Sequence, residues 1–220
     1  MIAEAAHELG LDNLTLKAVA DHLDVSIAAL YHYVSGKDDL LRLAAEYAAS
    51  RVPLPEDKGQ HWAVWLLEWA TYNRDVFLAR RGLLAQYMEG AISAEVIATR
   101  VDAILGPLVR QGFSIAEANA AYELVSQCAL GAAVATIRER EAADAGLDVV
   151  AAYRDILGSR GADELPHLRS LMRESRSGVR RPFAEQVATV LIGVAIRRGD
   201  DWRAVEAIVT AASPNAKLAR

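Results

Sequence analysis

The sequence VSIAALYHYVSGKDDLL, residues 25–41, holds three consecutive ring side chains, Tyr31, His32 and Tyr33, within a segment of helical spacing. Successive residues of a helix point in different directions, so only one side of a short helix can be buried. The two apolar positions at helical spacing, Leu30 and Val34, are enough to form that side. The stretch therefore predicts a short helix whose ring side chains lie mostly at the surface.

The residues before this stretch predict a helix-turn-helix. LKAVADHL (Leu16 to Leu23) forms a second helix with an apolar side, and the tight turn DVS joins it to IAALYHYV. Thr15, Ser26 and Ser35 stand where side-chain oxygens cap helix starts, and Ser35 with Asp38 has capping-box spacing. In such a unit the helix after the turn enters the major groove of DNA. The alternative is a plain helical corner whose aromatic residues cover a core.

The helix-turn-helix interpretation assigns DNA contacts to the residues that do not form the small core. Apolar side chains can touch thymine methyl groups, and hydroxyl and ammonium groups can bind phosphates. Ile27, Ala28 and Ala29 fit the first role, whereas Tyr31, Tyr33 and Lys37 fit the second. The complete predicted set is Thr15, Lys17, Ser26, Ile27, Ala28, Ala29, Tyr31, His32, Tyr33 and Lys37.

The region LTLKAVADHLDVSIAALYHYVSGKDDLL resembles the DNA-binding region of the tetracycline-repressor (TetR) family. The resemblance covers residues 3–47 and departs at Asp24, where the family usually has glycine. The matching positions are Leu14, Thr15, Val19, Ala20, Leu23, Val25, Ser26, Leu30, Tyr31, Tyr33, Val34, Lys37 and Leu40. The resemblance implies a dimeric regulator that binds a palindromic operator and responds to a small molecule.

The whole chain reads as all-α, with two parts. Helical periodicity runs through its 220 residues, and RVPLPEDKG (51–59) interrupts it with two prolines. We expect a helix-turn-helix domain over residues 1–52 and a helical domain over residues 53–220, which the resemblance assigns to ligand binding and dimerisation. The basic segment from Ser175 to Pro182 is expected to be a surface loop, with a mobile lid as the alternative.

The charge balance opposes bulk attraction to DNA. The chain carries a net charge of −5, and residues 1–52 hold four basic and eight acidic residues. DNA binding by this region must therefore depend on a few local contacts. We see no export leader and only one cysteine, so we expect a cytoplasmic protein without a disulfide.

The larger part carries an aromatic stripe that suggests a ligand site. Trp62, Trp65 and Trp69 share one helical face, and buried tryptophans keep an N–H group that needs a partner. The candidate ligand-binding residues are Trp62, Trp65, Trp69, Tyr72, Tyr87, Met88, Asn119, Gln127 and His167, with His61, Asn73 and Gln86 as further polar candidates. A simple core is the alternative for the whole stripe.

No catalytic signature, metal cluster or cofactor motif is visible. The small residues within helices near Cys128–Ala135 and Val187–Ile196 predict close helix packing. The resemblance implies that these helices form a four-helix bundle across a two-fold axis; a monomer core is the alternative. We therefore expect a ligand-responsive repressor rather than an enzyme. The alternatives are a ligand-binding or enzymatic protein of the same fold that has lost DNA binding, and a constitutive DNA-binding dimer without a ligand.

Overall fold

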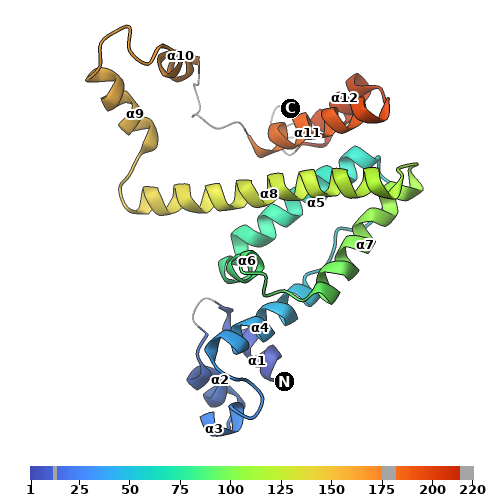
Figure 1. The fold of residues 1–220 in the computed structure, drawn as a ribbon, viewed down its shortest axis with the longest axis vertical. Coiled ribbons are helices and arrows are strands. Elements are labelled where there is room, and N and C mark those ends of the chain that lie inside the picture. Colours follow the sequence, from blue (N-terminus) through green and yellow to red (C-terminus); the bar gives the residue numbers. More distant parts are fainter. Residues whose placement is uncertain (12–13, 175–181, 214–220) are drawn as a thin grey trace.

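The computed structural model describes residues 1–11, 14–174 and 182–213, and all regular structure in them is helical (Figure 1). The prediction of an all-α chain is confirmed. The helices are α1 (Ile2–Leu9), α2 (Leu16–Leu23), α3 (Ile27–Leu30), α4 (Lys37–Arg51), α5 (Trp62–Ala79), α6 (Arg81–Met88), α7 (Ala94–Arg110), α8 (Ile115–Asp144), α9 (Val149–Gly158), α10 (Pro166–Glu174), α11 (Phe183–Arg198) and α12 (Trp202–Ala212).

Helices α1 to α4 form a small head with its own core. Leu30 and Val34 are buried there, as the spacing predicts, and α1 packs against both α2 and α4. Thr15 caps α2 by accepting the Ala18 N–H, and Ser26 caps α3 by accepting the Ala29 N–H. The turn between these two helices is therefore fixed by its own side chains.

Asp24 adopts the left-handed conformation that the turn requires, with φ 53° and ψ 46°. Aspartate tolerates this region better than most residues, although glycine adopts it at lower cost. The departure from the family pattern at this position thus leaves the turn geometry intact.

The start of α4 corrects one sequence prediction. Ser35 does not cap this helix: Gly36 occupies the N-cap position, and the Asp39 carboxylate accepts the backbone N–H and the hydroxyl of Ser35. Ser35 was predicted to accept a hydrogen bond from the first turn of α4. Instead it donates two hydrogen bonds to Asp39, a residue of that turn. The Ser35 amide, followed by the Arg42 guanidinium, holds the pKa of Asp39 below its ordinary value.

Helices α5, α7, α8, α11 and α12 form the body. The most extensive pairing is between α5 and α8, and the largest core cluster joins residues of all five helices. Ser114 and Glu117 form the predicted capping box at the start of α8. Helix α4 leaves the head and touches α6 and α7, so it connects the two parts (Figure 1).

Helices α9 and α10 lie beyond the C-terminal end of α8, away from the body (Figure 1), and neither has a buried residue. The connection between them is held by Arg169, which donates hydrogen bonds to the carbonyls of Leu157, Arg160, Gly161 and Glu164. The predicted loop at 175–182 lies outside the described residues, apart from Pro182.

Candidate DNA-binding face and ligand cavity

The ring side chains of residues 31–33 lie at the surface of the head. Tyr31 is 56% exposed and Tyr33 is 74% exposed, while Leu30 beside them is 1% exposed. The other predicted DNA contacts are also exposed, except for the half-buried Ala29. The head therefore presents hydroxyl, imidazole and small apolar groups together at the end of the molecule farthest from α8 (Figure 1).

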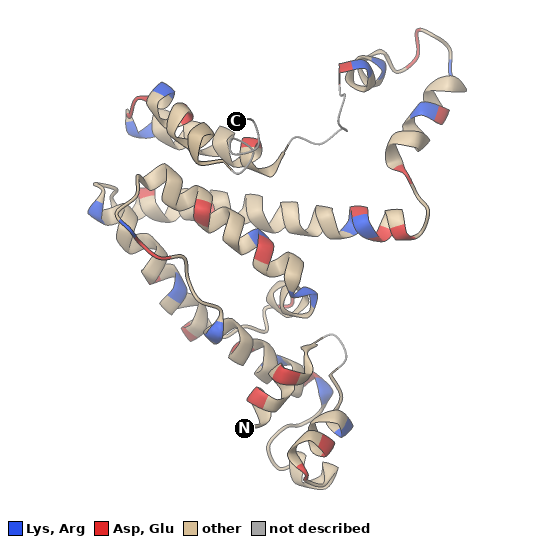
Figure 2. Cartoon of the chain, turned by 180° about the vertical axis from the view of Figure 1, so that it is seen from behind, with Lys and Arg blue, Asp and Glu red and all other residues tan. Residues whose placement is uncertain are grey.

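Few cations accompany this face. Arg42 pairs with Asp39 and Glu46, and the Arg51 guanidinium stacks on the ring of Tyr47. Lys17 and Lys37 are exposed and have no ion pair among the residues that the structure describes. Figure 2 shows acidic and basic residues interspersed along the helices of the head. Lys17 and Lys37 are thus the candidate cations for contacts with phosphate in the described part of this face.

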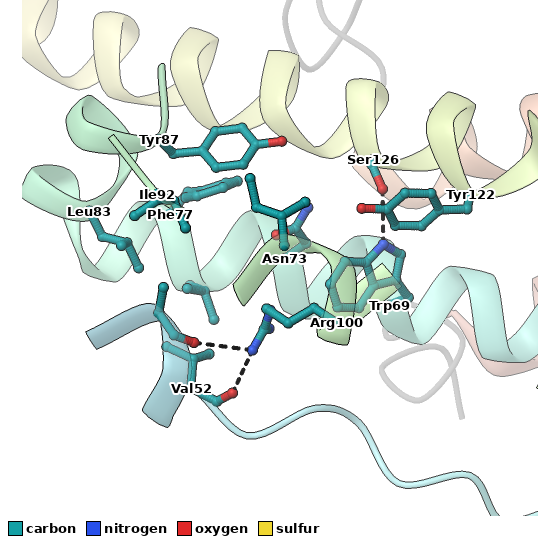
Figure 3. A pocket seen from close by; sticks show the side chains of 13 residues that line it. Val52, Trp69, Asn73, Phe77, Leu83, Tyr87, Ile92, Arg100, Tyr122 and Ser126 are labelled. Atoms are coloured by element: carbon teal, nitrogen blue, oxygen red, sulfur yellow. Dashed lines mark hydrogen bonds between the residues drawn. The ribbon is translucent and has the colours of Figure 1, made fainter. Parts of the chain in front are cut away.

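A cavity of about 80 Å³ lies where α4 meets the body, close to the last turn of that helix. Its walls come from five helices and the α6–α7 connection, and Figure 3 shows their side chains converging. The lining residues are Ala49, Val52, Trp69, Asn73, Val76, Phe77, Leu83, Tyr87, Ile92, Ile97, Arg100, Tyr122 and Ser126.

The cavity combines aromatic walls with a few polar groups. Trp69 donates its ring N–H to the Ser126 hydroxyl at 3.0 Å, and its ring lies 6.1 Å from that of Tyr122. Burial raises the pKa of Tyr122, and its neutral hydroxyl is a possible hydrogen-bond donor at the cavity. The Asn73 amide has no hydrogen-bond partner among the described residues (Figure 3). Such a site suits a flat, mostly apolar molecule with a few polar atoms.

Arg100 supplies the one positive charge among the described residues that line this cavity. Its Nη1 donates hydrogen bonds to the Val52 carbonyl at 2.8 Å and to the Ala49 carbonyl at 3.3 Å (Figure 3). Both carbonyls belong to the C-terminal end of α4. The cavity and the helix that leads to the head therefore share a side chain.

The predicted ligand-binding residues do not all meet at this cavity. Trp69 and Tyr87 line it, whereas Trp62 and Trp65 lie in the core, where Trp65 donates its ring N–H to the Ile104 carbonyl. Tyr72 donates its hydroxyl hydrogen to the Pro53 carbonyl, and Met88 is 62% exposed. The stripe divides because α5 is packed on several sides, so its successive tryptophans face different neighbours.

The remaining predicted residues lie farther from the cavity. Asn119 and Gln127 are on α8, where Asn119 donates a hydrogen bond to Glu123 and Gln127 is exposed. His167 is exposed on α10. Of the further polar candidates, Asn73 lines the cavity, His61 caps α5, and Gln86 donates to Glu89.

Sequence reasoning missed several cavity residues, chiefly Phe77, Arg100, Tyr122 and Ser126. Tyr122 and Ser126 are four residues apart on one helix, and this spacing places two hydroxyls on one face. That signal was readable from the sequence. Arg100 gave no local signal, because its partners are about fifty residues away along the chain.

A second hollow, on the outside of the body, runs between α8 and α11 and includes Leu124, Val190 and Gly193. Gly193 is exposed, and a Cβ added there would meet no atom within 4 Å; the same holds for Gly131 on α8. Figure 2 shows that the middle of α8 carries no charged residue. By length and apolar composition α8 could cross a membrane, but it packs against α5, α7 and α11. Within one chain, therefore, no helix of the described residues packs closely against Gly131 or Gly193, although the sequence predicted close packing for these segments.

Comparison with known proteins supports the helix-turn-helix assignment. The profile of the family described as bacterial regulatory proteins, tetR family, matches residues 2–44. An HTH-type transcriptional regulator of Saccharopolyspora erythraea is 29% identical over 166 residues, which are 74% of this chain and 70% of that protein. An HTH-type transcriptional repressor of Mycobacterium tuberculosis is 28% identical over 149 residues, which are 65% of this chain but only 57% of that protein.

Solved structures share the fold over most of the chain. Apo ActR of Streptomyces coelicolor superimposes with a TM-score of 0.69 at 22% identity, covering 90% of this chain and 94% of that one. The complex of the same protein with actinorhodin gives 0.67 at 22% identity, with coverage of 90% and 96%. A TetR variant of Acinetobacter baumannii bound to minocycline gives 0.55 at 23% identity, also with coverage of 90% and 96%. At these identities the likeness establishes the fold alone.

Proposed function

We propose that the chain, whose residues 2–44 match the tetR family of bacterial regulatory proteins, is a dimeric repressor of that family which leaves its operator when a small molecule occupies the cavity beside α4. The observation that carries this proposal is the position of the cavity. It touches the last turn of α4, the helix whose first turn follows the DNA-binding face.

For DNA binding, the support is the exposed set on α3 and the following turn. Tyr31 and Tyr33 are exposed and carry hydroxyl groups of the kind that donate hydrogen bonds to phosphates, and the exposed Lys37 begins α4. Ile27 and Ala28 are exposed at the start of the recognition helix, where such residues contact base edges. The matched family profile covers all these positions.

For ligand binding, the support is the chemistry of the cavity. Aromatic rings and a few polar groups are the usual lining of small-molecule sites. Two proteins of similar fold were solved with small molecules, ActR with actinorhodin and a TetR variant with minocycline. We expect an aromatic effector here, with Trp69, Tyr87 and Tyr122 as the contacts that its rings make.

For dimerisation, the support is the hollow between α8 and α11. Ala120, Leu124 and Gly193 in this hollow are exposed in one chain, and Gly193, with Gly131 elsewhere on α8, leaves room for close approach by another helix. A second copy placed there by a two-fold axis would give two heads for two half-sites, about 34 Å apart or a multiple of that. The function requires no catalysis, and we expect the protein to act on the chromosome in the cytoplasm.

The mechanism has two states. Without effector, the two recognition helices of the dimer sit at the spacing of successive major grooves. An effector that binds more tightly to a state with a different α4 position shifts the population toward that state and weakens operator binding. The effector releases DNA only to the extent that its affinity differs between the two states.

The test is selection of DNA from a random-site library, followed by a mobility shift with the selected sequence. We expect a palindromic site and a complex that contains two protein chains. Absence of any specific site, both in the selection and upstream of the protein's own gene, would falsify the proposal. That outcome would favour a ligand-binding or enzymatic protein of the same fold, for which the acidic head is the motivating feature.

A further inference from the structure

Arg100 holds the end of α4 from the side of the cavity. The last carbonyls of a helix have no partner within the helix, and a cation near them is favourable because they carry partial negative charge. Arg100 comes from α7 and donates Nη1 hydrogen bonds to Ala49 and to Val52, the C-cap residue of α4. This side chain is therefore a charged cap supplied by another helix.

The guanidinium has no opposite charge beside it. Arg100 is half-buried, and no carboxylate of the described residues lies within ion-pair distance of it. Its Nε and Nη2 N–H groups also lack an acceptor in the described part of the chain, and the cavity residues around it are uncharged. These N–H groups are not fully buried, because no buried side-chain nitrogen or oxygen of the described residues lacks a hydrogen-bond partner, so they are open to an incoming acceptor. The cavity is thus electrostatically prepared for an anion.

The shape of the cavity selects among anions. Phe77 and Tyr87 have ring centroids 5.2 Å apart, and Trp69 and Tyr122 form a second ring pair. Flat aromatic surfaces fit such walls. The planar fork of an arginine matches a carboxylate with two parallel hydrogen bonds, which a neutral oxygen cannot reproduce. The two requirements together describe an aromatic carboxylate.

The cavity is also small for a ligand. Its volume of about 80 Å³ is well below the roughly 300 Å³ at which most ligand sites begin. An entering molecule must therefore displace part of the wall. A ligand carboxylate that takes the end-on fork of Arg100, Nη1 together with Nη2, would replace the Ala49 and Val52 carbonyls as the acceptor of the Nη1 hydrogen bonds.

Resting on the function proposed above, we infer that the effector is an aromatic carboxylate and that Arg100 is its receptor and the coupling residue. Binding transfers the guanidinium from the Ala49 and Val52 carbonyls to the carboxylate. The last turn of α4 then loses its cap, and the head is no longer held at the spacing that the operator needs.

The first experiment compares acids with their amides. Calorimetric titrations use 2-naphthoate against 2-naphthamide and 9-anthracenecarboxylate against its amide. We expect the acids to bind at least tenfold more tightly to the wild-type protein, and the difference to disappear in Arg100→Gln. Arg110→Gln is the matched control, since Arg110 lies on the same helix but pairs with Asp57 outside the cavity. Equal binding of acid and amide, no binding of any acid, or a preference that survives Arg100→Gln overturns the inference.

The second experiment measures hydrogen exchange of the amides at residues 49–52. Ligand binding usually slows exchange, whereas loss of the cap should accelerate it in this turn. We expect faster exchange with 2-naphthoate in the wild type, and fast exchange without ligand in Arg100→Gln. Slower or unchanged exchange with bound acid overturns the coupling role. Operator binding by the unliganded protein is measured in parallel. If the protein binds its operator but shows no preference for acids over amides, the role of Arg100 is wrong while the proposed repressor function stands.

Discussion

The head and the body of this protein place their functional side chains in opposite ways. The head buries small aliphatic residues and leaves Tyr31, His32 and Tyr33 at the surface, within one continuous stretch. The body turns most of its aromatic residues inward, and the cavity draws its lining from five helices. The proposed DNA-binding surface is built from local sequence, whereas the proposed small-molecule site requires the whole tertiary fold.

The largest expected effect is a loss of stability on removing Trp65. It tests whether Trp65 belongs to the core while Trp69 lines the cavity. Trp65 is 2% exposed and bonded to the Ile104 carbonyl. We expect Trp65→Ala to lower the free energy of unfolding by about 3–5 kcal/mol, because it leaves a cavity in the core. Urea denaturation measures this change.

Trp69→Phe is the matched control for Trp65→Ala. It keeps an aromatic ring in the cavity wall, and we expect it to cost less than about 1.5 kcal/mol. If Trp65→Ala were no more destabilising than Trp69→Phe, the division between a structural and a ligand-facing tryptophan would be wrong.

The next effect tests the head. We expect Tyr33→Ala combined with Lys37→Ala to weaken operator binding roughly 100-fold, which corresponds to about 2.7 kcal/mol, while the melting temperature stays nearly unchanged because both residues are exposed. Lys58→Ala, in the linker between head and body, is the control and should leave affinity unchanged. Fluorescence anisotropy with the selected operator gives both values.

The same titrations at several salt concentrations sharpen this result. If Lys17 and Lys37 are the cations that each head offers, the dimer neutralises about four phosphates, and the slope of log K against log salt is about −3.6. Removing Lys37 from both heads should flatten the slope by about 1.8. A much steeper wild-type slope would show that other basic residues take part.

The smallest effect concerns pH and lies at the start of α5. The His61 ring nitrogen Nδ1 accepts the Ala63 N–H at 3.2 Å, and burial lowers the pKa of His61, against a weaker opposing influence of Asp200. As pH falls, the unfolded chain takes up this proton before the folded one does. The protein should therefore lose stability between about pH 7 and pH 5.

Substitution of His61 isolates this contribution. His61→Asn keeps a capping oxygen but has no proton to gain, so it should show a smaller fall in melting temperature over the same pH range. Calorimetric scans at pH 7, 6 and 5 compare the two proteins. An equal fall in both would remove His61 as the cause.

Sequence patterns predicted the head more completely than the body, for a physical reason. Thr15, Ser26 and Asp24 act on their own neighbours, so their roles follow from spacing. The prediction that Ser35 caps α4 was wrong. Asp38 and Asp39 are both close enough in sequence to bond back to residue 35, and in the structure Asp39 accepts the Ser35 N–H. Arg100 was invisible because its partners are set by how α7 crosses α4. Helix caps involve residues close in sequence and can be predicted from it, whereas the cavity joins residues that are far apart in sequence.

Helix α4 is also a mechanical element with a definite length. Its 15 residues at about 1.5 Å each make a rod of roughly 22 Å. A tilt of about 10° around the end that Arg100 holds would move the other end by roughly 4 Å. In a dimer the two heads would separate by about twice that distance, a large part of the roughly 12 Å width of a major groove. The exchange of two hydrogen bonds is thereby converted into a displacement on the scale of the DNA itself.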